Sequence, residues 1–291
     1  MISVPQAFFD NPKIDVFLRN GRNCVIRKEA MEVNANNERY LAAHAITVVH
    51  AGHLVANTPD GERQVVDPGK MILLPRGIYM ISDIIPQTEP FRATVFFFDD
   101  ELIESFLERF ESPGANGIER TSFAIFHFSD DLALFLDNLI RLQSAYKHRD
   151  LTSLKLLEFL HLVAGSAEGS RLLAMLFALR NRKKQSVKNF MEQNFEKPLG
   201  IEDYAYLTGR SVSTFHRDFK RQFGQSPKSW LMEKRMAKAH DRLLASPDLS
   251  VTQLAYHAGY DNVSYFIRAF QRQFGISPKQ LQIKIRDGMM V

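Results

Sequence analysis

The sequence predicts an α+β protein, with a β-barrel or β-sandwich and helices in its N-terminal part and an all-α domain after them. Two observations support this prediction. Short apolar runs separated by Gly and Pro turns occupy residues 41–98, which is typical of an antiparallel barrel or sandwich. A segment that occurs twice occupies residues 205–278, and its period of about 50 residues with helical spacing predicts two copies of one helical unit.

The composition limits the classes of protein to consider. A chain of 291 residues suits two domains better than one, and a hydrophobic content of 45% is enough for ordinary cores. The lone cysteine, Cys24, excludes an intrachain disulfide and fits a reducing compartment. The first residues do not have the pattern of a signal peptide, and no apolar run approaches the roughly 20 residues that span a membrane. We therefore expect a cytoplasmic protein with no membrane partner and a buried, unreactive Cys24.

Charge is distributed unevenly along the chain. Residues 181–291 contain 19 Lys and Arg against 10 Asp and Glu, a net charge of +9, whereas residues 1–180 contain 18 against 23, a net charge of −5. A basic C-terminal third predicts a polyanionic partner for that third. The acidic remainder is better suited to sensing or assembly.

The N-terminal part is read as strands in order along the chain. Residues 1–40 give a weak signal: two short strands at 16–18 and 24–26 around an Asn20-Gly21 turn, and a loop at 34–37. A regular series of strands and turns follows. Strands are predicted at 45–50, 52–56, 63–66, 71–74, 79–81 and 91–98, with turns at 59–61, 67–69 and 75–77. The cadence of strand, Asp-Pro-Gly, strand, Pro-Arg-Gly, strand resembles a cupin-like barrel, which would cover about 14–98.

Helices are predicted after the barrel, over about 99–178. The predicted ranges are 99–110, 129–147, 151–163 and 170–179, with a loop at 112–117. The second of these helices has an apolar stripe made of Leu132, Phe135, Leu136, Leu139 and Leu142. This stripe packs inside the domain or contributes to a two-fold dimer contact, and the sequence leaves both alternatives open. The aromatic residues of the last strand, Phe91, Phe96, Phe97 and Phe98, are expected to fill the barrel rather than to line a ligand pocket.

The repeat has the spacing of helix, turn and helix. Its first block recurs at an offset of 50 and its second at 51, so one residue is inserted in the turn. Phenylalanines recur at i, i+4 and i+8, which places them on one helical face: Phe215, Phe219 and Phe223, then Phe266, Phe270 and Phe274. Gly209 and Gly259 are expected to end the preceding helices. Ser226 and Ser277, each before Pro, are predicted N-caps. Ser250 begins a capping-box pattern, and Gly200 is the weaker cap at the matching place.

One long helix, residues 227–245, is predicted between the two copies, and Ser246-Pro247-Asp248 ends it. At 1.5 Å per residue it is roughly 28 Å long. Arg235 is expected to make an internal or backbone contact, and Trp230 to anchor the core. The residues expected to fix the helix to both copies are Trp230, Leu231, Met236, Ala239, Leu243 and Leu244.

With these motifs in place, residues 185–282 resemble the DNA-binding domain of AraC/XylS-type bacterial transcription regulators. The matching residues are Ala205, Phe219, Gly224, Ser226-Pro227, Trp230-Leu231, Arg235, Ala239, Leu243-Leu244, Ser250, Ala255, Gly259-Tyr260, Phe266, Arg268, Phe270, Gly275 and Ser277-Pro278. The chain departs from the family pattern at Tyr204, where a leucine is common, and at 279–282, where an aromatic-Arg pair is usual. The resemblance implies a cupin-like sensing or dimerisation domain at 1–178, a basic linker at 179–186 and a DNA-binding domain at 187–285.

In this interpretation the second helix of each copy reads bases in the DNA major groove. A short helix that packs on one face and presents cations on the other suits that groove, whereas the alternative is a solvated basic helix in an unrelated bundle. The expected base-reading residues are Ser213, His216, Arg217, Asn262, Ser264, Tyr265 and Arg268. Asn262 either reads adenine or caps its helix, and the cap is favoured. The expected phosphate contacts are Lys220, Arg221, Arg272 and Lys279.

The partner expected from this interpretation is double-stranded DNA, with RNA polymerase as a second partner if the protein activates transcription. A homodimer through the N-terminal helices and a small-molecule or protein effector are further alternatives. The competing functional readings are a cupin-type metal enzyme using His44, His50 and His53, and a protein-interaction module. The histidine spacing does not fit a two-His-one-carboxylate site, and nucleophile, P-loop and dinucleotide motifs are absent from the sequence. We therefore predict a regulator that is not an enzyme and has no cofactor.

Overall fold

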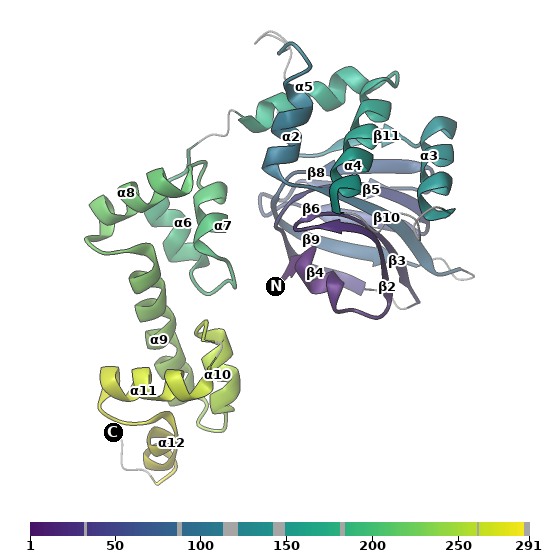
Figure 1. Cartoon of the computed structure of the whole chain (residues 1–291). Coiled ribbons are helices and arrows are strands. Elements are labelled where there is room, and N and C mark those ends of the chain that lie inside the picture. Colours follow the sequence, from purple (N-terminus) through teal and green to yellow (C-terminus); the bar gives the residue numbers. More distant parts are fainter. Residues whose placement is uncertain are drawn as a thin grey trace. The chain divides into compact units, whose positions relative to one another are not determined.

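The computed structural model describes residues 1–31, 34–85, 89–112, 122–141, 149–180, 184–260 and 262–287. The chain forms two compact units, Met1–Arg182 and Lys183–Val291. We call them the N-terminal and C-terminal domains and describe each by itself. The first combines sheets with helices and the second is helical, so the α+β class predicted from the sequence is confirmed (Figure 1).

The N-terminal domain is built on two sheets that face each other. One has the strand order β1-β4-β9-β6-β7 and the other β11-β8-β5-β10-β3-β2, and all pairs are antiparallel except the parallel pair β1 and β4. The strands of the five-stranded sheet are β1 (Ile2–Val4), β4 (Asn34–Leu41), β9 (Gly77–Ile84), β6 (His53–Asn57) and β7 (Arg63–Val66). Those of the six-stranded sheet are β11 (Ala124–His127), β8 (Lys70–Leu74), β5 (His44–Ala51), β10 (Phe91–Phe98), β3 (Asn23–Ala30) and β2 (Ile14–Asn20).

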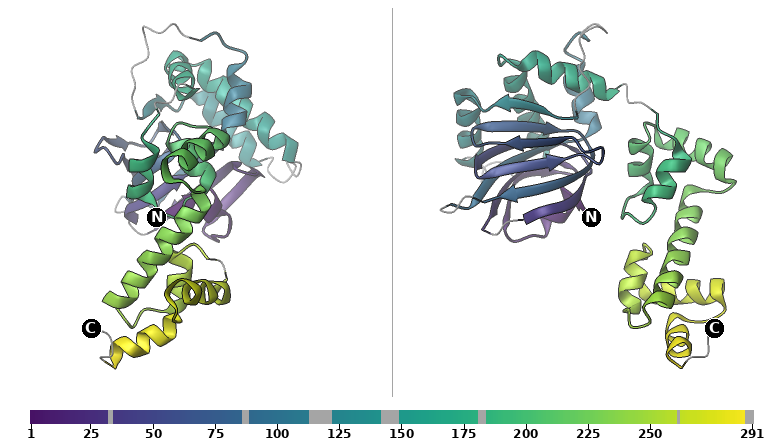
Figure 2. Two further views of the ribbon diagram at one scale, coloured as in Figure 1. Left: turned by 90° about the vertical axis from the view of Figure 1, so that its left-hand side faces the viewer. Right: turned by 180° about the vertical axis from the view of Figure 1, so that it is seen from behind.

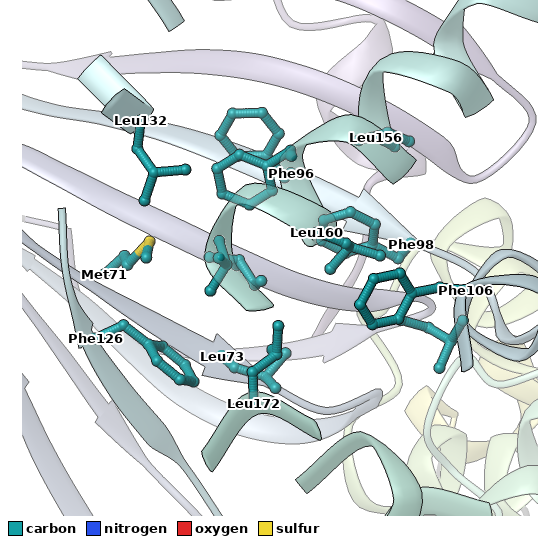
Figure 3. Packing of buried hydrophobic residues seen from close by; sticks show 14 of the residues in the cluster. Met71, Leu73, Phe96, Phe98, Phe106, Phe126, Leu132, Leu156, Leu160 and Leu172 are labelled. Carbon is teal, nitrogen blue, oxygen red and sulfur yellow. The ribbon is translucent and has the colours of Figure 1, made fainter. Parts of the chain in front are cut away.

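Helices cover the outer face of the six-stranded sheet (Figure 2). They are α2 (Asp100–Leu107), α3 (Asp130–Arg141), α4 (Arg149–Ala164) and α5 (Gly169–Arg180), and a short helix α1 (Gln6–Phe9) follows β1. The domain therefore has two cores, one between the sheets and one between the six-stranded sheet and the helices. Figure 3 shows the second core, where Met71 and Phe96 from the sheet meet Leu132 and Leu160 from the helices.

The aromatic residues of β10 divide between these two cores because neighbouring strand residues point to opposite faces. Phe91 and Phe97 lie between the sheets, as predicted. Phe96 and Phe98 lie on the helix-covered face instead, where the Phe96 and Phe159 rings stack with centroids 3.8 Å apart. The prediction that all four residues fill the barrel is therefore wrong for Phe96 and Phe98. The described residues of the α3 stripe, Leu132, Phe135, Leu136 and Leu139, pack in the same core.

Several predicted boundaries need correction. Residues 34–37, predicted as a loop from their Asn content, begin β4, and the pairing of β4 with β9 has a register shift between Asn34 and Asn37. A shift of this kind admits residues with weak strand propensity. β1, α1 and β11 were not predicted. α2 ends at Leu107 rather than 110, and α5 continues to Arg180, into the predicted linker. Most of the loop at 112–117, Leu142 and the end of the helix at 129–147 lie outside the described residues.

The C-terminal domain consists of seven helices in its described residues. The first half contains α6 (Val187–Asn194), α7 (Ile201–Leu207) and α8 (Val212–Phe223), and the second half contains α10 (Val251–His257), α11 (Val263–Phe274) and α12 (Pro278–Arg286). The long helix α9 (Pro227–Ala245) joins the halves with the bounds that the sequence predicts. Figure 1 shows α9 as a rod with one half at each end.

Each end of α9 packs into the core of the nearer half. Trp230 is 4% exposed and lies against Phe195, Phe219 and Phe223 of the first half, as predicted for a core anchor. Met236, Ala239 and Leu243 pack into the core of the second half. Leu244, predicted to help fix the rod, is 42% exposed and lies outside the core of the second half.

Candidate nucleic-acid interface

Helix α8 presents one packed face and one exposed polar face. Phe215 and Phe219 are fully buried, and the Phe219 and Phe223 rings stack with centroids 4.3 Å apart. The predicted base-reading and phosphate residues of this helix are all exposed on other sides of it: Ser213, His216, Arg217, Lys220 and Arg221. Ser211 caps the helix, because its Oγ accepts a hydrogen bond from the Thr214 amide at 3.3 Å. Gly224 ends it at φ +73°, a conformation that favours glycine.

Helix α11 repeats this arrangement with different side chains. Phe266 and Phe270 are fully buried, whereas Ser264, Tyr265, Arg268 and Arg272 are exposed. The Arg268 guanidinium lies 6.0 Å from the centre of the Tyr265 ring, within the range of a cation–π contact. The two side chains therefore lie next to each other near the start of α11, where residues of a reading helix reach base edges.

The turn before each exposed helix has the predicted glycine. Gly209 and Gly259 have φ values of +70° and +79°, so both positions require left-handed backbone. The inserted residue lies after the glycine: Arg210 alone separates Gly209 from the N-cap Ser211, whereas two residues separate Gly259 from the N-cap Asn262. The turn of the second half is thus one residue longer.

Helices α7 and α10 begin after the N-cap residues that the sequence predicts, Gly200 and Ser250. Ser250 stands at the N-cap of α10, but its side chain makes no capping hydrogen bond. Gly200, the weaker cap by sequence, has no side chain that could cap α7. The helix start is held instead by Asp203, whose Oδ2 accepts a hydrogen bond from the Gly200 amide at 2.9 Å. Ser226 and Ser277 cap α9 and α12 as predicted, accepting from the Ser229 and Gln280 amides.

An ion pair joins the middle of α8 to the turn before it. Arg210 Nε donates to Asp218 Oδ2 at 2.9 Å, and both side chains are largely buried. The hydrogen bond from Arg210 holds the pKa of the Asp218 carboxyl below its usual value. Arg221, an expected phosphate contact, also donates to Asp218, at 3.2 Å. Its charge is therefore partly engaged within the helix, although the side chain is 72% exposed.

The structure supports the cap interpretation of Asn262. Its Oδ1 accepts a hydrogen bond from the Tyr265 amide at 2.9 Å, as an N-cap residue does. Arg235 makes the expected backbone contacts, donating to the Phe195 and Lys197 carbonyls, each at 2.6 Å.

Each of the three histidines considered as metal ligands has a different hydrogen-bond partner. His44 pairs with Asp100 at 3.0 Å, His50 with Thr94 at 2.9 Å and His53 with Asp67 at 3.2 Å. Within the described ranges, the side chains do not form a group of three or more His, Cys, Asp or Glu suited to a metal ion. Cys24 is buried, and burial raises the pKa of its thiol.

Comparison with known proteins decides the family. A model of the ExsA N-terminal regulatory domain matches residues 44–175, and a helix-turn-helix domain model matches residues 204–283. The thermoregulatory protein LcrF of Yersinia pestis is 30% identical over 228 residues, which are 77% of this chain and 83% of LcrF. The chain belongs to the AraC/XylS family of transcriptional regulators. It has a DNA-binding helix-turn-helix domain and an N-terminal regulatory domain.

Two further known proteins are similar to this AraC/XylS regulator. The virulence regulon transcriptional activator VirF of Yersinia enterocolitica is 30% identical over 224 residues, 75% of this chain and 81% of VirF. A crystal structure of apo ToxT from Vibrio cholerae covers 92% of this chain and 99% of its own, with 13% identity and a TM-score of 0.48. In the described part of the regulator, none of the helices combines the length and the apolar character needed to cross a bilayer.

The repeat points to one candidate interface residue of this AraC/XylS regulator that the sequence motifs alone did not suggest. Lys279, an expected phosphate contact in the first turn of α12, is exposed. The offset of 51 aligns it with Lys228 in the first turn of α9, which is also exposed. Because both lysines follow a Ser-Pro helix start, each adds a cation to a helix N-terminus that already favours phosphate. The offset of 51 residues between the two copies was the sequence signal that identifies Lys228.

The regulatory domain of this family member contains a buried cluster of charges. Lys28 and Arg39 both approach Asp83, Arg39 with Nη2 3.6 Å from Oδ2, and the three side chains are 11%, 5% and 1% exposed. Burial, together with the Arg39 guanidinium, lowers the pKa of Lys28 to about 8 in spite of Asp83. Arg39 Nε and Asp83 Oδ1 are buried without a hydrogen-bond partner in the described chain. Two cations therefore share one carboxylate beneath a cavity of about 630 Å³.

Proposed function

We propose that this regulator activates transcription by reading two successive major grooves on one face of the DNA with α8 and α11. The observation that carries the proposal is a pair of equivalent helices at the two ends of α9. Each buries its phenylalanines in the core of its own half and exposes its polar side. With 19 residues, α9 is roughly 28 Å long, close to the roughly 34 Å of one DNA turn. The name of VirF as an activator supports the direction of control.

We assign the side chains of the two helices by position and chemistry. Arg217 and Arg268 are equivalent in the repeat and are the principal base readers, because a guanidinium donates bidentately to guanine O6 and N7. Ser213, His216, Ser264 and Tyr265 complete the base-reading set, and Asn262 acts as a cap. The phosphate contacts proposed are Lys220, Arg221, Arg272, Lys279 and Lys228, which position the protein without specifying sequence.

The partners proposed beyond DNA are RNA polymerase and a second copy of the chain. Leu134 on α3 and Leu154 on α4 are 63% and 60% exposed, and apolar side chains of this kind on the helical layer support a two-fold contact there. The functional domains proposed are a sensing and dimerisation domain at 1–178, a linker at 179–186 and a DNA-binding domain at 187–285. A cytoplasmic location and the absence of enzymatic activity follow from this role.

The buried charge cluster supports control by a small-molecule effector. The cluster has two cations and one carboxylate. Burying the second positive charge costs free energy unless another group compensates it. Lys28 and Arg39 line the cavity beside Phe8 and Ile14, so an effector with one negative charge would balance the cluster. Its binding would shift the placement of the DNA-binding domains or release them from the N-terminal domain.

The proposed DNA reading is tested by selecting binding sites for the full-length protein from random duplexes. Fluorescence anisotropy at two salt concentrations then compares an enriched duplex with a scrambled one. We expect enrichment of a site with two short elements about one helical turn apart, and tighter binding to it that weakens with salt. A selection that enriches no sequence, with equal binding to both duplexes, would reject sequence-specific reading.

A further inference from the structure

The two halves of the C-terminal domain are connected by more than the backbone of α9. Glu196 lies between α6 and α7 and therefore belongs to the first half. Its carboxylate contacts two residues in the later turns of α9: Oε2 lies 2.6 Å from Arg242 Nη2 and Oε1 lies 3.2 Å from Lys238 Nζ. That part of α9 packs into the core of the second half through Ala239 and Leu243. Glu196 thus bridges from the first half to the section of the rod that belongs to the second.

Arg235 makes the same connection from the middle of α9. Its guanidinium donates to the Phe195 and Lys197 carbonyls, on either side of Glu196, each at 2.6 Å. On its other side it reaches the turn glycine of the second half, because a Cβ added at Gly259 would lie 2.8 Å from Arg235 Nη1. One side chain therefore holds the loop of the first half and lies against the turn that precedes α11.

These contacts form one cluster on a single face of α9. Arg235, Lys238 and Arg242 are spaced i, i+3 and i+7, which places them above one another on the helix. Together with Glu196 they line a cavity of about 30 Å³, and His257 and Ala258 of the second half line its other side. Side chains from both halves and from the rod therefore meet at the same place.

We infer that Glu196 and Arg235 are positioning residues that fix the separation and rotation of α8 relative to α11, and so determine which spacing of DNA elements the protein accepts. If each half were held only by its own end of α9, it could rotate about that end at little cost in free energy. The cluster restrains that rotation, because the charge-assisted hydrogen bonds of Arg235 have fixed directions. The inference rests on the proposed reading of two grooves.

DNA spacing is a sensitive measure of this restraint. Inserting one base pair between two elements moves one of them by about 3.4 Å and rotates it by roughly 35° about the DNA axis. A rigid pair of halves loses one set of contacts on such a duplex, whereas a loosened pair can adjust to it. Spacing discrimination therefore reports on the connection between the halves, while binding to a single element reports on each reading helix alone.

The experiment uses the full-length protein and the duplex enriched by selection, together with versions that have one base pair inserted or removed between the elements and a version with one element scrambled. The variants are Arg235→Lys, which keeps the charge but loses the planar fork, and Glu196→Gln. Glu192→Gln is the matched control, because Glu192 is exposed on α6 and also belongs to the first half. It removes the same negative charge from that half without touching the cluster. Thermal unfolding confirms that each variant is folded.

We expect wild-type protein and Glu192→Gln to bind the altered spacings about ten-fold or more weaker than the selected one. For Arg235→Lys and Glu196→Gln the penalty falls to about three-fold or less, while affinity for the single-element duplex is unchanged. A full spacing penalty in both variants would overturn the inference. An equal loss of affinity on every duplex would overturn it as well, because it indicates a role in stability alone. If selection with the wild-type protein enriches only one element, the proposed reading of two grooves has failed. This result is distinct from the two outcomes that overturn the role of Glu196 and Arg235.

Discussion

Arg217 and Arg268 differ in surroundings although they are equivalent in the repeat. Arg217 follows His216 on a helix whose acidic residue, Asp218, is paired with Arg210. Arg268 lies over the Tyr265 ring on a helix without an acidic residue. The Tyr265 contact restricts the guanidinium before DNA binds, so less side-chain entropy is lost when it bonds a base. We therefore expect Arg268 to be the better ordered of the two proposed base readers.

Replacing Arg268 with Ala should weaken binding to the selected duplex by roughly 1–3 kcal/mol and relax preference at one base pair. The measurement is anisotropy against duplexes that carry each base in turn at every position of the enriched site. Arg272→Ala, one turn further along α11, is the control and should weaken binding to all duplexes alike. Unchanged affinity and unchanged base preference in Arg268→Ala would remove Arg268 from the base-reading set.

Lys28 gives a prediction about pH, because burial lowers its pKa to about 8 from an ordinary value of 10.5. Between these two values the unfolded chain binds the proton and the folded chain does not, so stability rises with pH. The unfolding free energy of the wild type should therefore rise from pH 8 to pH 10 relative to Lys28→Met, by at most about 1.4 kcal/mol per pH unit. Urea titrations of both proteins at several pH values measure the difference.

At neutral pH, Lys28→Met should be at least as stable as the wild type, because it leaves Arg39 and Asp83 as a balanced pair. Lys70→Met, at a half-exposed strand position paired with Asp67, is the control for loss of a lysine from the same domain. A large loss of stability in Lys28→Met alone would show that the lysine supports the fold, and would remove the argument for an anionic effector.

The helices of the C-terminal domain were predicted closely because their signals are local. A Ser-Pro start, a phenylalanine stripe and a glycine end lie within about a dozen residues of one another, and the bounds of α9 were correct at both ends. β4 and β11 were missed because nothing local marks them. Their partners, β9 and β8, lie 36 to 57 residues away along the chain. Such pairing overrides the propensity of residues like Asn34.

The assignment of Phe96 and Phe98 failed for a related reason. β10 is buried on both faces, so the alternation that shows which side a residue faces is absent from its sequence. Only the helices α2 to α5 reveal that one face has a second core. The candidate site was more predictable, because exposure on α8 and α11 follows from the phenylalanine stripe. The pairing of Asp218 with Arg210 and the contacts of Arg235 depend on tertiary structure. The sequence around these residues therefore contained no pattern that predicts them.

The N-cap of α11 gives a test at the level of the element. Asn262→Ser keeps an oxygen that can accept from the Tyr265 amide, whereas Asn262→Ala removes it. We expect Ala to lower the unfolding free energy by about 0.5–2 kcal/mol and Ser to change it little. Circular dichroism during thermal unfolding compares the three proteins. If Ser keeps stability but changes the preferred base next to the Arg268 contact, Asn262 reads DNA in addition to capping.

The charge of the whole molecule is divided between its domains, and this division predicts a salt dependence. The acidic N-terminal part adds no attraction for DNA, so binding should vary with salt according to the phosphate contacts of the C-terminal domain. Lys228→Ala and Lys279→Ala should each reduce the slope of log K against log salt by about 1. Lys70→Ala, in the N-terminal domain, is the control. An unchanged slope in Lys228→Ala would show that the repeat equivalence does not extend to DNA contact.

The six-stranded sheet has a consequence for how the molecule opens in solution. Its outer face is under helices and its inner face is under the other sheet, so amides in the middle of β10 meet water only when the whole N-terminal domain unfolds. Helices α8 and α11 are covered on one side, and local fraying exposes their amides sooner. In deuterated water, deuterium should therefore enter the amides of α8 and α11 first and those of β10 last. Its arrival in β10 measures the lifetime of the folded N-terminal domain.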